Sequence, residues 1–188
     1  MNKSRVEALT DGIIAIAATI MVLELGIPAA NDLSSLLVLR HAFLAYVNSF
    51  LMIYIVWSMH HDLFHKAKTL SRRSFLVNGI WVFLLTLVPF TTAWVGSAVD
   101  ETLPELIYPL NLLLWRLAFQ WLDYQIKKDN PDIPREFFAS RPAEIFVYAV
   151  YIICMALAFV VPRLSIYVIG TLTLAMFTWY FIKGKNAS

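Results

Sequence analysis

The stretch Arg5–Leu25, RVEALTDGIIAIAATIMVLEL, decides the fold of this chain. Most of it is an apolar run with the composition and length of a membrane-spanning helix. Two polar residues interrupt the run, because Asp11 stands at its start and Thr19 in its middle. A carboxylate at the edge of the hydrocarbon is costly unless it is paired. The stretch therefore predicts a membrane helix and a local partner for Asp11.

The composition of the whole chain is that of an integral membrane protein. Of its 188 residues, 60% are hydrophobic and only 15% are charged, and the mean hydropathy is +0.67. Soluble domains carry about 25% charged residues, and a soluble protein of this size could not bury so much apolar surface. We expect a single transmembrane domain over residues 1–188, embedded in a lipid bilayer.

Six apolar segments approach the ~20 residues that a membrane helix needs. They predict an all-α membrane protein with six transmembrane helices per subunit. Prolines stand at or next to several segment ends, whereas Pro89 and Pro109 lie inside the third and fourth segments and predict kinks there. The expected spans lie near 6–26, 36–62, 75–98, 104–125, 143–162 and 164–182.

The basic residues are divided unevenly between the two sides of these spans. The N-terminal segment, the second and fourth loops and the C-terminal segment together hold 12 of the 15 Lys and Arg residues. The loops of the other side hold only Arg40 and Arg163. Because cytoplasmic loops are enriched in basic residues, this division predicts cytoplasmic N- and C-termini. We expect a multi-pass protein of the cell inner (plasma) membrane.

The first predicted helix is rich in small residues and has no aromatic side chain between Arg5 and Leu25. Ile16, Ile20 and Leu23 share one face at i, i+4 and i+7, and Thr19 lies beside that face. Small residues permit close helix approach, so a packing stripe inside a bundle is one interpretation. The other is a pore wall, in which apolar rings gate by dewetting and a threonine ring offers hydroxyl oxygens.

Polar residues gather at the start of the first predicted helix. Arg5 and Thr10 are local partners for Asp11. A plain cap is the rival explanation for Asp11, because backbone N–H groups near a helix N-terminus also favour an anion.

Three histidines near the end of the second predicted span raise the question of a metal site. His61 and His65 are four residues apart, yet no HExxH motif accompanies them. We therefore expect no bound metal. A hydrogen bond from His60 or His61 to Asp11 is the favoured interpretation, since these residues and Asn78 lie at one predicted depth.

Three motifs together resemble the lysosomal and endosomal potassium channels, the transmembrane protein 175 family, and its single-repeat bacterial members above all. The family signature is an arginine, a Phe-Ser-Asp triplet and a small residue before an Ile/Ala/Thr/Leu helix, and RVEALTDG at residues 5–12 is similar to it. The pattern WxxHHxLF at Trp57–Phe64 and the stretch LVPFTTAWVG also fit. The triplet here is Leu-Thr-Asp, which keeps the hydroxyl but loses an aromatic contact.

The resemblance implies a homotetramer that conducts potassium ions through a central pore lined by the first helix of each subunit. An isoleucine ring at Ile16 would be the narrowest point, with further rings from Thr19, Ile20 and Leu23. No TVGYG-like carbonyl filter is present, and no cofactor is implied. A structural polar network would fix the first helix to its neighbours, formed by Arg5, Thr10, Asp11, His60, His61 and Asn78.

The sequence thus favours a potassium-selective or potassium-preferring cation channel. The alternative is a proton-conducting channel or a proton-coupled transporter that uses Asp11 and a histidine. A transporter needs titratable groups near the membrane midplane, and the middle of the first helix has none. An enzyme is disfavoured, since the sequence has no paired carboxylates, nucleophile motif or metal triad, and we expect no nucleic-acid partner. Whether Ile16 or Thr19 sets selectivity is left open.

Overall fold

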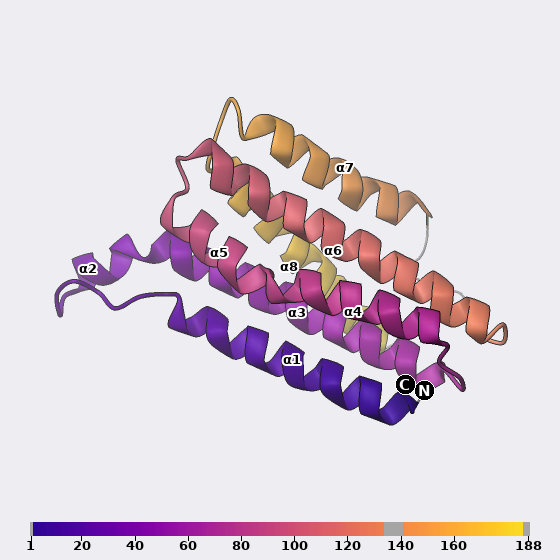
Figure 1. Ribbon diagram of the computed structural model, residues 1–188. Coiled ribbons are helices and arrows are strands. Elements are labelled where there is room, and N and C mark those ends of the chain that lie inside the picture. Colours follow the sequence, from indigo (N-terminus) through magenta and orange to yellow (C-terminus); the bar gives the residue numbers. More distant parts are fainter. Residues whose placement is uncertain (1, 134–140, 186–188) are drawn as a thin grey trace.

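The computed structural model describes residues 2–133 and 141–185, and the regular structure in these residues is entirely helical (Figure 1). This confirms the all-α class. Helix α1 begins and helix α8 ends at the same end of the bundle. The elements are α1 (Lys3–Leu23), α2 (Leu33–Val38), α3 (Arg40–Lys66), α4 (Arg72–Thr86), α5 (Val88–Ser97), α6 (Thr102–Asp129), α7 (Arg141–Leu157) and α8 (Leu164–Lys185).

Three segments in the described residues are long and apolar enough to cross a membrane. They are α1, α3 and the α4–α5 pair Arg72–Ser97. The apolar parts of α7 and α8 are shorter. Helix α6 has 28 residues, a length of about 42 Å, but it is more polar. Several membrane-spanning candidates are therefore present, while the number six stays a prediction.

The segment expected near 36–62 is two helices rather than one. Its first residues belong to α2, which begins before the expected span. The N-terminus of α2 is capped by Asp32, whose Oδ1 accepts from the Ser35 N–H at 2.7 Å. Leu39 lies between the two helices, and α3 then continues to Lys66, beyond the expected end.

The segment expected near 75–98 is also divided, and here the sequence contained the reason. Helix α4 ends at Thr86 and α5 begins at Val88, because Pro89 has no N–H and its ring excludes the carbonyl one turn earlier. Pro109, where a kink was also expected, lies inside α6, which is one continuous helix from Thr102 to Asp129.

A stack of buried aromatic rings joins α3, α4 and α6. The His60 ring lies between Phe64, at a centroid distance of 4.2 Å, and Trp81, at 4.7 Å. Trp81 stacks in turn on Trp115 at 6.0 Å. Such pairs contribute about 0.5–1.5 kcal/mol each beyond the burial of their area, so the stack holds these three helices in one arrangement.

Helix α1 lies along one side of the bundle, and α7 lies along the opposite side (Figure 1). Within the described residues, α1 packs against α3, α4 and α5, whereas α7 packs against α6 and α8. Helix α1 therefore meets the bundle with one face only. Its buried residues are Val6, Thr10, Ile14, Ala17 and Met21.

The loop between α3 and α4 is bound by residues at the start of α1 and at the end of α6. The Lys3 ammonium donates to the Phe64 and Ala67 carbonyls, both at 2.9 Å, and so binds the C-terminus of α3. Beyond α6, the Asn130 side-chain oxygen accepts from the Thr69 N–H at 2.8 Å. These contacts fix α1, α3 and α6 to one another at the end where the termini lie.

Helix α5 approaches α3 closely at Gly96. A Cβ atom at Gly96 would lie 2.7 Å from the Cα of Ala42. Gly96→Ala should therefore separate the two helices and lower the thermal unfolding temperature in detergent, since overpacking costs about 1–3 kcal/mol. Gly79→Ala in α4 is the matched control, because a Cβ there meets nothing within 4 Å. A Gly96→Ala protein as stable as the control would contradict this packing.

Candidate functional site

The four residues expected to line a pore all lie on the uncovered face of α1. Ile16, Thr19, Ile20 and Leu23 are exposed in the single subunit. The accessible fraction is 59% for Ile16 and 77% for Leu23, values that a packing stripe inside this subunit would not give. The pattern read from the sequence thus corresponds to one continuous exposed strip, which we call the α1 strip and define by these four residues.

Thr19 is the polar member of the α1 strip. Its hydroxyl donates to the Ile16 carbonyl of its own helix at 2.9 Å. The proton of the hydroxyl is used locally, so the oxygen remains available as an acceptor.

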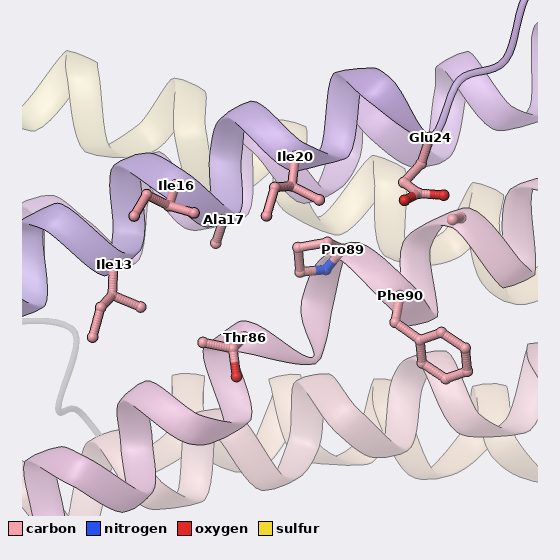
Figure 2. Close-up of a pocket in the computed structure, with 9 residues that line it drawn as sticks. Ile13, Ile16, Ala17, Ile20, Glu24, Thr86, Pro89 and Phe90 are labelled. Atoms are coloured by element: carbon pink, nitrogen blue, oxygen red, sulfur yellow. The ribbon is translucent and has the colours of Figure 1, made fainter.

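A hollow of about 390 Å³ separates α1 from the α4–α5 break (Figure 2). Ile16 and Ile20 line it, so the hollow is continuous with the α1 strip, and the Glu24 carboxylate is the charged group in its wall. Pro89 faces α1 across it. Whatever covers the α1 strip can therefore also reach the break in α4–α5. The remaining lining residues are Ile13, Ala17, Thr86, Phe90 and Ala93.

Three buried side chains form a hydrogen-bonded chain across α1, α4 and α3. The Asn78 amide nitrogen donates to Thr10 Oγ1 at 2.9 Å, and His60 Nε2 lies 2.9 Å from the Asn78 oxygen. Since that oxygen can only accept, His60 donates and carries its proton on Nε2. None of the three is more than 4% exposed. These hydrogen bonds therefore join three helices inside the protein.

Asp11 is bound by a tryptophan and not by a histidine. Trp57 Nε1 donates to Asp11 Oδ1 at 2.9 Å, whereas His61 Nδ1 lies 3.5 Å from Glu7 Oε1. Both contacts join α1 to α3. An indole N–H can only donate, so Asp11 is anchored at this point and not linked directly to an imidazole. Sequence reasoning missed this partner, although Trp57 belongs to the same WxxHH pattern as His60 and His61.

Arg5 stands apart from these contacts. It is exposed, and within residues 2–133 and 141–185 its side chain has no hydrogen bond or ion pair. Lys3 makes the basic contact of this helix end instead.

Thr10 is seven residues into α1 and Asn78 six residues into α4, so both lie about 10 Å along their helices. The hydrogen bonds of Asn78 with Thr10 and with His60 bring these three residues together, while their common depth in the membrane stays a prediction.

The histidines near the end of α3 do not gather into a metal centre. His60 is bonded to Asn78, and His61 lies beside Glu7. In the part of the chain that the structure describes, no group of three His, Cys, Asp or Glu side chains could hold a metal ion. Cys154 is buried and free.

These features define an all-helical membrane protein whose first helix is anchored on one face and open on the other. Residues 5–89 match the model of a family described as endosomal/lysosomal potassium channel TMEM175. Over 169 residues the chain is 32% identical to the potassium channel HX13_20290 of Chryseobacterium sp. (strain P1-3), covering 88% of each protein. The chain belongs to the TMEM175 family, which is a family of ion channels and not of enzymes.

Two further comparisons bear on fold and cargo. The crystal structure of a lysosomal potassium-selective channel TMEM175 homolog from Chamaesiphon minutus matches with a TM-score of 0.80 and 28% identity. That match covers 95% of this chain and 97% of the other. The human endosomal/lysosomal proton channel TMEM175 is 34% identical over 117 residues, which are 54% of this chain but 23% of the human protein.

Thr10→Val should destabilise the protein, because the buried Asn78 amide would lose its acceptor. An unpaired buried donor costs about 1–3 kcal/mol. Thr10→Ser keeps the hydroxyl and is the matched control. The measurement is thermal unfolding of the purified protein in detergent, with the oligomeric state followed by light scattering. Equal stability of the valine and serine variants would show that this hydrogen bond does not anchor α1.

Proposed function

We propose that the chain is a potassium-selective or potassium-preferring cation channel, in which α1 from each subunit of a homotetramer lines a central pore. The observation that carries the proposal is the exposed α1 strip in a chain that belongs to a channel family. Potassium is the proposed ion because the similar proteins of Chryseobacterium and Chamaesiphon minutus are named potassium channels.

The side chains beside the α1 strip favour contact with other copies of α1 over contact with lipid. Gly12 and Ala15 are exposed on the same side of the helix as Ile16 and Thr19. Small residues allow helices to approach closely, whereas they offer lipid little surface. An assembly of α1 helices around an axis would cover this face, and neighbouring subunits would fill the hollow beside Pro89.

The proposed topology has six spans in a single domain. They are α1, α3, the α4–α5 pair, α6, α7 and α8, with α2 as a short helix on the side opposite the termini. The excess of Lys and Arg, 12 against 2, supports cytoplasmic termini in an inner (plasma) membrane. The polar contacts of α1 would then lie at the cytoplasmic end of the pore.

In the proposed mechanism, apolar rings and not backbone carbonyls control the passage of ions. Helix α1 is continuous from Lys3 to Leu23, so its carbonyls are engaged within the helix and cannot replace the water around an ion. A ring of Ile16 side chains would form the constriction, followed by rings at Ile20 and Leu23. Passage then depends on wetting and on how easily the ion sheds water. The contacts of Thr10 and Asp11 would set the rotation of α1.

Proton conduction is the second candidate, and the name of the human relative favours it. The contacts described above favour a proton-conducting pore over a transporter with a relay. Asp11 receives its hydrogen bond from Trp57, and the His60 proton points to Asn78. A relay from Asp11 to a histidine would have to break both contacts in each cycle.

Ile16→Asn should increase cation flux and reduce potassium selectivity, because a polar ring lets water occupy the constriction. We expect a rise of about tenfold, which corresponds to a barrier lower by about 1.4 kcal/mol. The measurement is potassium and sodium flux into liposomes that contain the purified protein. Ile16→Val keeps an apolar ring and is the control. A folded Ile16→Asn protein with unchanged flux and selectivity would contradict the role of Ile16.

A further inference from the structure

A buried carboxyl group lies far from α1, at the end of the bundle opposite the termini. Glu105, in the first turn of α6, is 0% exposed and is the one buried Asp or Glu among the described residues. The Ser165 hydroxyl donates to its Oε2. Its Oε1 has no hydrogen-bond partner in the described part of the chain. An incompletely bonded carboxylate in such a place is costly.

The Arg163 guanidinium is paired with Asp100 and not with Glu105. The Arg163 guanidinium donates two hydrogen bonds to Asp100, at 2.8 and 2.7 Å, on the exposed surface. These hydrogen bonds hold the pKa of Asp100 below its usual value, so Asp100 keeps this partner across the neutral range. Arg163 also has a φ of 79°, which is uncommon for a residue other than glycine. The α7–α8 turn is thus held by two contacts, that of Arg163 with Asp100 and that of Ser165 with Glu105.

The other groups that face Glu105 supply no positive charge either. Tyr108 on α6, Cys154 on α7 and Asp100 before α6 are its titratable neighbours. His41 on α3 faces Arg163 and Asp100. The backbone N–H groups of Arg163 and Ser165, at the start of α8, also face the carboxyl group.

We propose that Glu105 is a proton-binding site that responds to pH on the side of the membrane opposite the termini. Burial between α6, α7 and α8 favours the neutral acid. The Ser165 hydroxyl and the backbone N–H groups of Arg163 and Ser165, around the start of α8, favour the anion. Because these influences oppose each other, both forms are accessible. Proton binding weakens the carboxyl as an acceptor and so loosens its hold on the α7–α8 turn.

Infrared difference spectroscopy on the purified full chain tests this proposal without any channel measurement. Between about pH 5 and pH 9, which brackets the range above an ordinary glutamate, the native protein should reversibly lose the C=O stretching band of one buried carboxylic acid. Glu105→Gln should lack that band. Glu101→Gln, which changes an exposed neighbour, should retain it. A Glu105 band absent at every pH, or unchanged throughout the range, would overturn the proposal.

Ser165→Ala provides a second test that does not depend on replacing Glu105. The anion loses its hydroxyl donor in this variant, so the band should persist to a pH higher by about one unit. If the band of Ser165→Ala were lost at the same pH as in the native protein, the role assigned to the Ser165 hydroxyl would be overturned. Labelling of the glutamate carboxyl groups with carbon-13 would shift the band and assign it to glutamate if Glu105→Gln fails to fold.

Discussion

The hydrogen bond from Asn78 to Thr10 determines which side of α1 is left open. Helix α1 meets the rest of the subunit with one face, and apolar packing alone would tolerate small rotations about its axis. A shift of one residue turns a helix by about 100°, which would move Ile16 off the exposed side. The buried Asn78 amide permits one register, because it must donate to Thr10 and accept from His60. The geometry of the α1 strip follows from that requirement.

The polar residues near the start of α1 therefore join helices to one another, and the residues left exposed on α1 are mostly apolar. The charged and amide groups near the start of α1 hold helices together, and the trio of Thr10, Asn78 and His60 is buried. The α1 strip, by contrast, is exposed and consists of isoleucine and leucine except at Thr19. Glu105 is a separate case, since it lies at the other end of the bundle and is bound by the start of α8.

The sequence predicted what depends on periodicity and on single-residue chemistry. The helical class, an irregularity at Pro89, and the face shared by Ile16, Ile20 and Leu23 follow from spacing and from the missing proline N–H. Side-chain partners between helices could not be predicted, because they depend on the distance and rotation of packed helices. Trp57 reaches Asp11, and Lys3 reaches the end of α3, only once α1 and α3 are docked. The burial of Glu105 likewise depends on how α8 begins.

We propose above all that this chain forms a pore that passes potassium in preference to other cations. The most direct test is the reversal potential of current through the protein in a planar bilayer, with a potassium gradient imposed while sodium and proton concentrations are equal on both sides. We expect a reversal potential close to the potassium equilibrium potential. A current that is absent under this gradient and appears only with a proton gradient would contradict it.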